Sequence, residues 1–323
     1  MQFGCADAVT HFVQKMQDVV AFGEINGGNQ VAFFGMSNID AVLGFTIPGR
    51  NARGRVVRLG PVLESILAAH GYPPAIERLL SDALVLTALL GTTLHEGDGQ
   101  MTMQAQTKGG AVDLLVCDYR NGELRGYVKH DPAKIPDLPH EPDMQTLFGE
   151  GYLAVTFDQA VTGERYQGIV PIEGKSLSDS IETYFAQSEQ IPSLVRTALS
   201  REIAGGLIVQ HLPEGEVGRE RLHVRTDHPE WEHVLALAHT ITGEELTDLD
   251  LPFEDIVWRL FNEEPEIRIL PSTPLSKGCR CDAEHVRSVI MQFPEDQRAE
   301  MADAAGLVNV DCAFCSKIFA VSI

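Results

Sequence analysis

The residues with the clearest chemical potential are four cysteines near the end of the 323-residue chain. They form two close pairs, Cys279-Arg280-Cys281 and Cys312-Ala313-Phe314-Cys315, separated by thirty residues. Zinc takes four thiolate ligands in closed, tetrahedral structural sites. The same four sulfurs can also be oxidised to disulfides. This spacing therefore predicts a metal site, a redox site, or a metal site that responds to oxidation.

The residues alone leave three hypotheses open: a permanent structural zinc site, a zinc site that oxidation switches, and a metal-free redox site. A zinc ribbon usually has two C-x₂-C pairs that lie closer together. A thioredoxin-like C-x₂-C is expected beside a βαβ pattern, whereas Cys312 and Cys315 lie at the extreme C-terminus. We therefore favour metal binding by all four cysteines. His285, four residues after Cys281, is interpreted as an ordinary helix residue.

Zinc binding and oxidation compete for the same sulfurs. A bound zinc ion keeps its cysteine ligands as thiolates, which are the oxidisable form. Their conversion to disulfides produces poor zinc ligands. Apparent zinc binding energies are on the order of 10 kcal/mol, and a unit as short as residues 276–323 rarely has a sufficient core of its own. We therefore expect loss of the metal to unfold this unit, and we expect Arg280 and Lys277 to balance the negative charge of a four-thiolate centre.

The composition bounds the class of protein. Hydrophobic residues make up 44% of the chain and charged residues 22%, which is ordinary for a soluble globular protein. No run of eighteen apolar residues indicates a membrane span, and the first twenty residues, which include Asp7 and Asp18, lack the pattern of a secretory signal. We therefore expect a cytoplasmic protein, in which paired cysteines indicate metal or redox chemistry rather than a disulfide scaffold.

The net charge of −21 disfavours nucleic acid as a partner, because an acidic surface repels phosphate groups. The charge is uneven: residues 226–267 contain twelve Asp and Glu against one basic residue, Arg259. One interpretation is a solvated acidic helical stretch. The other is a segment held close to its folding threshold, because self-repulsion opposes compaction.

Sequence patterns divide the chain into four parts. Residues 1–35 resemble nothing that follows and are expected to be either a flexible extension or the result of an upstream start codon, with the working start near Met36. Residues 36–222 mix strands and helices, and two hairpin signals favour an α+β core over a doubly wound parallel sheet. Residues 223–275 are expected to form an acidic helical linker, and residues 276–323 the four-cysteine unit. Strands are expected over 53–59, 100–107, 111–119, 123–129, 152–157 and 166–172, and helices over 61–69, 73–94, 176–188 and 192–204.

Apolar residues at helical spacing predict two helices in the linker, one around Trp231 and one around Trp258. Gly243 is expected to end the first helix. Both apolar stripes are expected to pack on the preceding domain. Cap and break residues predict the elements of the cysteine unit: Asp282 before a helix over 283–293, Pro294 and Gly306 at the ends of a second helix, and a strand over 307–310.

Two further motifs are interpreted as structural. Residues 168–176 (GIVPIEGKS) resemble a phosphate loop but have five residues between the glycines instead of four, so ATP binding is not expected. Gly174 is expected to form a turn before a helix that Ser176 caps. Cys117 falls in an apolar strand and is expected to be a buried core thiol.

An ordered series of short segments runs from about Ile39 to the end of the chain. The most specific is Tyr-Phe-x-x-Ser-Glu-Gln at 184–190, taken together with the cysteine spacing. The others include Phe45-Thr46-Ile47, Arg53-Gly54, His70-Gly71-Tyr72-Pro73, Leu124-Arg125-Gly126-Tyr127, Gly149-Glu150-Gly151-Tyr152-Leu153, Tyr166-Gln167-Gly168-Ile169-Val170, Gly205-Gly206 and Arg259-Leu260-Phe261-Asn262-Glu263. In this series the chain resembles the bacterial redox-regulated 33 kDa heat-shock chaperonin family.

The resemblance implies a reduced, zinc-bound resting protein in the bacterial cytoplasm, with Cys279, Cys281, Cys312 and Cys315 as metal ligands and redox sensors. It implies that oxidation pairs Cys279 with Cys281 and Cys312 with Cys315, releases zinc and unfolds a linker of about residues 223–275. The implied protein is not an enzyme but a holdase, often a homodimer, that protects unfolding client proteins without ATP. Two other functions stay open: a thiol–disulfide oxidoreductase that uses Cys312 and Cys315, and a constitutive zinc-ribbon interaction module.

Overall fold

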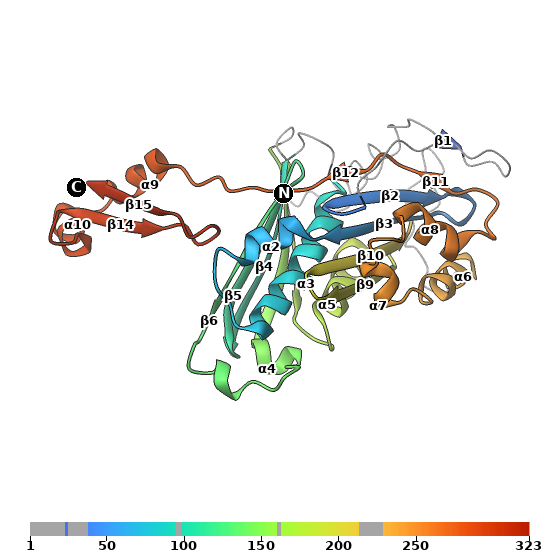
Figure 1. Ribbon diagram of the computed structural model, residues 1–323, viewed down its shortest axis with the longest axis horizontal. Helices are drawn as coiled ribbons and strands as arrows, with labels where there is room; N and C mark the ends of the chain where they lie inside the picture. The colour runs from blue at the N-terminus through green and yellow to red at the C-terminus, as the bar shows by residue number, and fades with distance from the viewer. Residues whose placement is uncertain (1–22, 25–37, 95–98, 160–162, 213–228, 323) are drawn as a thin grey trace, which may run out of the picture.

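Two largely antiparallel β-sheets enclose a central helix in the computed structural model, which describes residues 23–24, 38–94, 99–159, 163–212 and 229–322 (Figure 1). This mixture of sheets and helices confirms the expected α+β class. A smaller unit with the four cysteines lies to one side of the body, joined to it by an extended segment. In the described part of the chain, no helix is long and apolar enough to cross a membrane.

The six-stranded sheet contains both hairpins that the sequence predicts. Its strands are β4 (Gly99–Gly109), β5 (Val112–Arg120), β6 (Glu123–His130), β7 (Gly149–Gln159), β8 (Arg165–Pro171) and β13 (Ser276–Lys277), in the order β13-β6-β5-β4-β7-β8. Asn121 and Gly122 turn the chain between β5 and β6 with positive φ angles of 50° and 80°. Cys117 on β5 is fully buried, as predicted. The short β13 runs parallel to β6, so the segment that leads to the first cysteine pair adds a strand at this edge.

The seven-stranded sheet shows one prediction to be wrong, because residues 192–204 form strands rather than a helix. Its strands are β1 (Gly23–Glu24), β2 (Ala41–Ile47), β3 (Ala52–Leu59), β9 (Ser193–Ser200), β10 (Ile203–His211), β11 (Arg268–Ile269) and β12 (Thr273–Pro274), in the order β1-β11-β2-β3-β10-β9, with β12 also on β2. Leu194 and Val195 are both buried, and they belong to the hydrophobic clusters on opposite faces of this sheet. That alternation is the side-chain pattern of a strand.

The central helix α3 (Pro74–Gly91) lies between the two sheets, and thirteen of its eighteen residues are buried. Gly206 on β10 allows the close contact, because a Cβ there would lie 2.4 Å from Val85 of α3. Gly174 (φ 91°) precedes α5, and Ser176 caps α5 by accepting a hydrogen bond from the Asp179 N–H, both as predicted. The remaining helices of the core are α2 (Pro61–Leu67), α4 (Met144–Phe148) and α5 (Leu177–Tyr184), with a π-helical turn η3 at Phe185–Glu189 and 3-10 turns η1 (Pro48–Arg50) and η2 (Ile135–Asp137).

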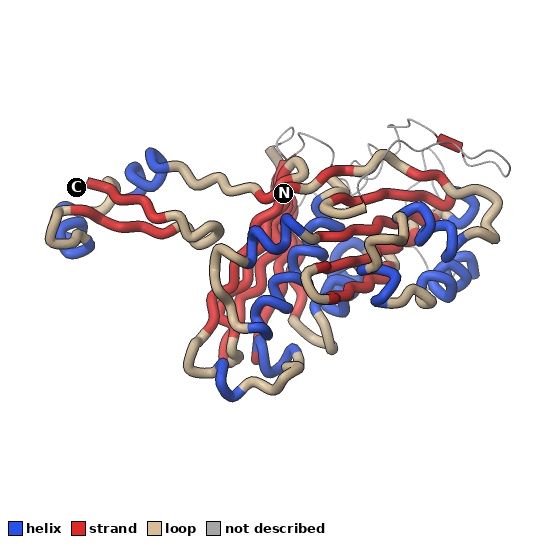
Figure 2. Tube along the Cα trace, in the orientation of Figure 1, coloured by secondary structure: helices blue, strands red, loops and turns tan. Residues whose placement is uncertain are grey.

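Three short helices cover the outer face of the seven-stranded sheet: α6 (Pro229–Ala238), α7 (Gly243–Thr247) and α8 (Phe253–Phe261) (Figure 2). Trp231 is buried there, but Trp258 is 51% exposed, so only the first tryptophan lies in the interface. The prediction that Gly243 ends a helix is wrong. The first helix ends at Ala238, and Thr242 caps α7 by accepting from the Glu245 N–H, so Gly243 begins the next helix.

The C-terminal unit has a very small core of its own. It consists of α9 (Ala283–Ile290), α10 (Glu295–Met301), β14 (Leu307–Asp311) and β15 (Ile318–Ser322). The buried side chains of its cluster are Ile290, Val308 and Val321. The predicted second helix ends at Met301 rather than at Gly306, because the Asp303 carboxylate accepts from the Leu307 N–H and forms a turn instead. The expectation that this unit needs a further stabilising element is therefore physically reasonable.

The predicted flexible extension, residues 1–35, falls almost wholly outside the described residues. Within it, Gly23 and Glu24 form β1, which pairs antiparallel with Ile269 and Arg268 of β11.

Candidate metal centre

The four cysteines that the sequence places in two pairs come together in space. Their sulfur atoms all lie within 4.8 Å of one another. The Sγ atoms of Cys279 and Cys312 are 3.6 Å apart, and so are those of Cys281 and Cys315. In a tetrahedral zinc site with metal–sulfur distances of about 2.3 Å, neighbouring sulfurs are roughly 3.8 Å apart. The arrangement therefore fits a single tetrahedral metal ion.

A β-turn positions the second cysteine pair. Cys312 and Cys315 lie in the loop between β14 and β15, where the Ser316 and Cys315 N–H groups both donate to the Cys312 carbonyl, at 2.8 Å and 3.3 Å. The Cys312 N–H donates to the Lys317 carbonyl at 2.9 Å and closes the loop. Ser316 takes a positive φ of 57°, which lets the chain reverse after the pair.

The first pair is positioned by the strand before it and the helix after it. Cys279 and Cys281 follow β13, and the Asp282 carboxylate then accepts from the N–H groups of Glu284 and His285 as the N-cap of α9, as predicted. His285 lies in α9 and is not part of the sulfur cluster, which confirms its interpretation as a helix residue.

The four thiols do not ionise independently. Burial, the largest cause, and the neighbouring thiols raise the pKa of Cys281 to about 12, and burial also raises the pKa of Cys279. Burial opposes ionisation of Cys315 too, but hydrogen bonds from the Lys317 backbone N–H and from the other thiols outweigh it and lower the pKa of Cys315. The cluster thus stabilises one thiolate readily, whereas four thiolates at such short distances require a cation among them.

The two basic residues expected to balance the cluster also attach this segment to the core. The Arg280 guanidinium donates to the side-chain oxygen of Gln100 on β4. Burial and the nearby Arg125 lower the pKa of Arg280. The Lys277 ammonium donates to the Ser65 carbonyl on α2. The cysteine-bearing segment is therefore held against both the sheet and α2.

A contact that the sequence analysis missed joins the second cysteine pair to the core. Phe314, inside the Cys-x-x-Cys loop, lies edge-to-face against Tyr127 on β6, with ring centroids 5.0 Å apart. The Arg125 guanidinium lies 4.0 Å from the centre of the Phe314 ring and forms an ion pair of 2.6 Å with Asp118 on β5. Aromatic and cation–π contacts each contribute on the order of 1 kcal/mol. The only sequence signal was a bulky apolar residue at the exposed tip of a loop.

A second set of contacts holds the linker helices on the core. Arg58 of β3 is fully buried and donates to the carbonyls of Leu246 and Leu251, each at 2.8 Å, and of Glu245 at 3.0 Å. Two of these carbonyls lie in the last turn of α7, where backbone carbonyls have no N–H partner within the helix. Burial lowers the pKa of Arg58 to about 10. One core side chain therefore satisfies backbone groups along the linker.

An ion cluster closes the other end of this interface. The Glu264 side chain, just beyond α8, is 1% exposed and accepts from Arg50 of η1 at 2.8 Å. Its second oxygen lies 2.8 Å from the His233 Nε2 atom on α6. Glu264 thus connects two linker helices to the core.

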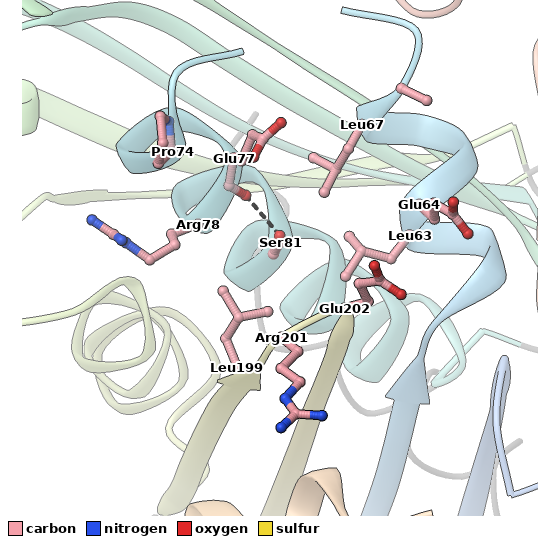
Figure 3. A pocket seen from close by; sticks show the side chains of 11 residues that line it. Leu63, Glu64, Leu67, Pro74, Glu77, Arg78, Ser81, Leu199, Arg201 and Glu202 are labelled. Carbon is pink, nitrogen blue, oxygen red and sulfur yellow. Dashed lines mark hydrogen bonds between the residues drawn. The ribbon is translucent and has the colours of Figure 1, made fainter. Parts of the chain in front are cut away.

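A pocket of about 540 Å³ lies between α2, α3 and the turn that joins β9 to β10 (Figure 3). No cysteine lines it. Its lining carries charged groups of both signs, namely Glu64, Glu77, Arg78, Arg201 and Glu202. Two of its polar groups are used internally, because the Ser81 hydroxyl donates to the Glu77 carbonyl and Arg78 donates to the His140 carbonyl. We assign no function to this pocket.

The fold and the cysteine cluster together define the class of protein. The family model described as "Hsp33 protein" matches residues 40–322. The chain belongs to the Hsp33 family, whose members are chaperones rather than enzymes. The 33 kDa chaperonin of Caulobacter vibrioides is 37% identical over 292 residues, covering 87% of this chain and 94% of that protein.

Two further comparisons agree. The 33 kDa chaperonin of Yersinia pestis is 33% identical over 285 residues, covering 87% of this chain and 91% of that protein. A crystal structure of the 33 kDa chaperonin from Thermotoga maritima, 21% identical, matches with a TM-score of 0.71 over 88% of this chain and 95% of that one. This last similarity concerns the fold alone.

Replacing Phe314 by alanine should loosen the cysteine unit without removing a metal ligand. We expect a loss of about 1 to 2 kcal/mol of docking free energy and roughly tenfold faster proteolysis in the segment before Cys279. Metal content should not change. Phe293→Ala, a partly exposed phenylalanine of the same unit, is the matched control. Equal proteolysis of both variants would contradict the docking role of Phe314.

Replacing Arg58 by methionine should weaken linker docking by about 3 kcal/mol, because buried carbonyls lose their donors. Trp258→Phe leaves Trp231 as the single tryptophan, and its emission should shift to the red when α6 leaves the core. In that background, Arg58→Met should lower the undocking temperature markedly. Arg259→Met, an exposed arginine of α8, should change it little. Equal effects would show that Arg58 is not a principal docking residue.

Proposed function

We propose that this protein is an ATP-independent holdase that is inactive when reduced and is activated by oxidation of its four cysteines. The observation that carries the proposal is the clustering of four sulfurs in a unit with three buried side chains in its own core. Membership of the Hsp33 family supports it. The proposed setting is the cytoplasm, where thiols are normally kept reduced. The proposal keeps the division of the chain into an extension (residues 1–35), a core (36–222), a linker (223–275) and a cysteine unit (276–323).

In the proposed resting state, Cys279, Cys281, Cys312 and Cys315 hold one zinc ion. When bound, zinc supplies the positive charge that keeps all four sulfurs ionised and the unit folded. Thiolate sulfur is the donor type that zinc prefers, and the distances between the sulfurs suit a tetrahedron. The raised pKa values of Cys279 and Cys281 indicate that these two thiols need a cation to stay ionised.

In the proposed oxidised state, Cys279 is bonded to Cys281 and Cys312 to Cys315. Each disulfide forms when a thiolate attacks peroxide to give a sulfenic acid and water, and the neighbouring thiolate then displaces the second water. Each pair loses two electrons to one peroxide, and two protons are taken up. The sulfurs that lie 3.6 Å apart belong to different proposed disulfides, because Cys279 lies near Cys312 and Cys281 lies near Cys315. The proposed pairing therefore requires the unit to rearrange before or while it oxidises.

The path from the cysteines to the linker is short. β11 and β12 pair with β2, and β13 pairs with β6, so one continuous segment connects α8 to Cys279 along the core. Unfolding of the cysteine unit removes the Phe314 contact and pulls on this segment. Moving an equilibrium from 1:99 to 99:1 needs about 5.5 kcal/mol, which is less than the roughly 10 kcal/mol of a structural zinc site. The metal site is thus strong enough to control linker docking.

Undocking of α6, α7 and α8 uncovers a large apolar sheet face. Its side chains include Leu43, Phe45, Ile47, Val56, Leu207 and Val209, all at most 1% exposed in the docked state. An uncovered apolar face of this kind binds unfolding proteins and lowers their aggregation. We propose this face, on a chain that dimerises when active, as the client-binding surface.

Zinc content and client protection should change together. Reduced protein should bind one zinc per chain and protect little, whereas protein treated with peroxide at elevated temperature should lose zinc and suppress aggregation of an unfolding client. Cys279→Ser should lower zinc affinity by roughly tenfold or more. Cys117→Ala, which removes a thiol outside the cluster, should behave as the wild type. Zinc loss without protection would rule out the holdase, and protection unaffected by peroxide would indicate a constitutive module.

A further inference from the structure

The sheet face under the linker is apolar but carries guanidinium groups. One of them, Arg196 of β9, is paired with the core carboxylate Glu182, and two others take their counter-charges from the linker. Arg50 lies at the end of η1, and Arg58 lies on β3 among the apolar residues that contact α6, α7 and α8. Both belong to the core and stay on it when the linker leaves. The chemistry of this face is therefore not purely hydrophobic.

The linker supplies the negative groups that act on these two cations. Arg50 is paired with Glu264 and is also attracted by Glu230. Arg58 is attracted by Asp248 and bonded to linker carbonyls. All three carboxylates lie in the linker, and within the described residues no core carboxylate is paired with either guanidinium. Removal of the linker thus leaves the half-buried Arg50 and the newly uncovered Arg58 without the carboxylates that balance their charges.

The linker is itself an occupant of defined chemistry. Residues 226–267 carry twelve acidic groups against Arg259, and the apolar side of α8, including Phe253, Ile256 and Leu260, faces the sheet. Phe253 also packs against Arg58, whose guanidinium carbon lies 4.9 Å from the ring centre. The face accepts apolar side chains, a carboxylate at Arg50, and the free carbonyls of a helix C-terminus at Arg58.

From this complementarity we infer that the uncovered face selects acidic amphipathic segments of unfolding proteins and discriminates against basic ones. The inference rests on the proposed function, because the linker must first undock. The net charge of the chain does not oppose it. About half of the −21 belongs to the linker, and charges farther than a Debye length of about 8 Å are largely screened at physiological salt. The preference for acidic segments is therefore decided by the new ion pair that Arg50 forms with a client carboxylate in place of Glu264.

Three peptides test this selectivity against the full-length, oxidised protein. The first has the sequence of residues 250–266 with a fluorescent label. In the second, its six carboxylates are replaced by the corresponding amides, and in the third by lysine; the apolar residues are the same in all three. We expect the acidic peptide to bind roughly tenfold more tightly than the amide form and the lysine form to bind weakest.

Matched variants locate the effect. Arg50→Gln should reduce the preference for the acidic over the amide peptide at least roughly threefold. Arg165→Gln, which alters an exposed arginine on the distant edge strand β8, should leave it unchanged. A shuffled acidic peptide that keeps the apolar helical spacing should bind like the first, because the proposed recognition is of charge and amphipathicity rather than of one sequence.

The outcomes separate this inference from the proposed function when aggregation suppression is measured on the same samples. If the oxidised protein protects clients but binds the three peptides equally, the charge selectivity is wrong and the holdase stands. If Arg50→Gln leaves the preference unchanged, the assignment to this face is wrong. An oxidised protein that neither protects clients nor binds any peptide would overturn both.

Discussion

Four sulfur atoms within 4.8 Å of one another are the constraint on which the rest of the structure depends. Like charges so close cannot all form without a cation, and the C-terminal unit has three buried side chains in its cluster with which to hold itself together. The stability of the unit is therefore tied to the ionisation of its cysteines. In the proposed mechanism, a chemical change at sulfur becomes a change in folding.

Contacts of the cysteine unit and of the linker with the two core sheets give this proposed change a route through the body of the protein. Phe314 and Arg280 attach the cysteine unit to the six-stranded sheet, while the linker helices lie on the seven-stranded sheet. One segment, from β11 to β13, connects the two sites along the edges of both sheets. The linker packs its apolar side chains on this sheet and makes polar contacts with the core residues Arg58 and Arg50, but it is strongly acidic, so self-repulsion opposes its docking. Such a segment is suited to respond when one of its ends is released.

Local patterns predicted much of this structure, and non-local contacts account for most of what was missed. The hairpin at Asn121-Gly122 and the cap at Asp282 follow from adjacent residues. Residues 192–204 were predicted as a helix, and only pairing with β10 makes this segment a strand. The cysteine spacing predicted the cluster. The contacts of Arg58 had no sequence signal, because its acceptors are backbone carbonyls nearly two hundred residues away.

Hydrogen–deuterium exchange of the reduced protein, measured before and after removal of the metal by a chelator, tests the central claim most directly. The account predicts that metal removal strips protection from residues 276–322 and then from α6, α7 and α8, while α3 and the two core sheets stay protected. Continued protection of the linker helices after the cysteine unit has unfolded would contradict it.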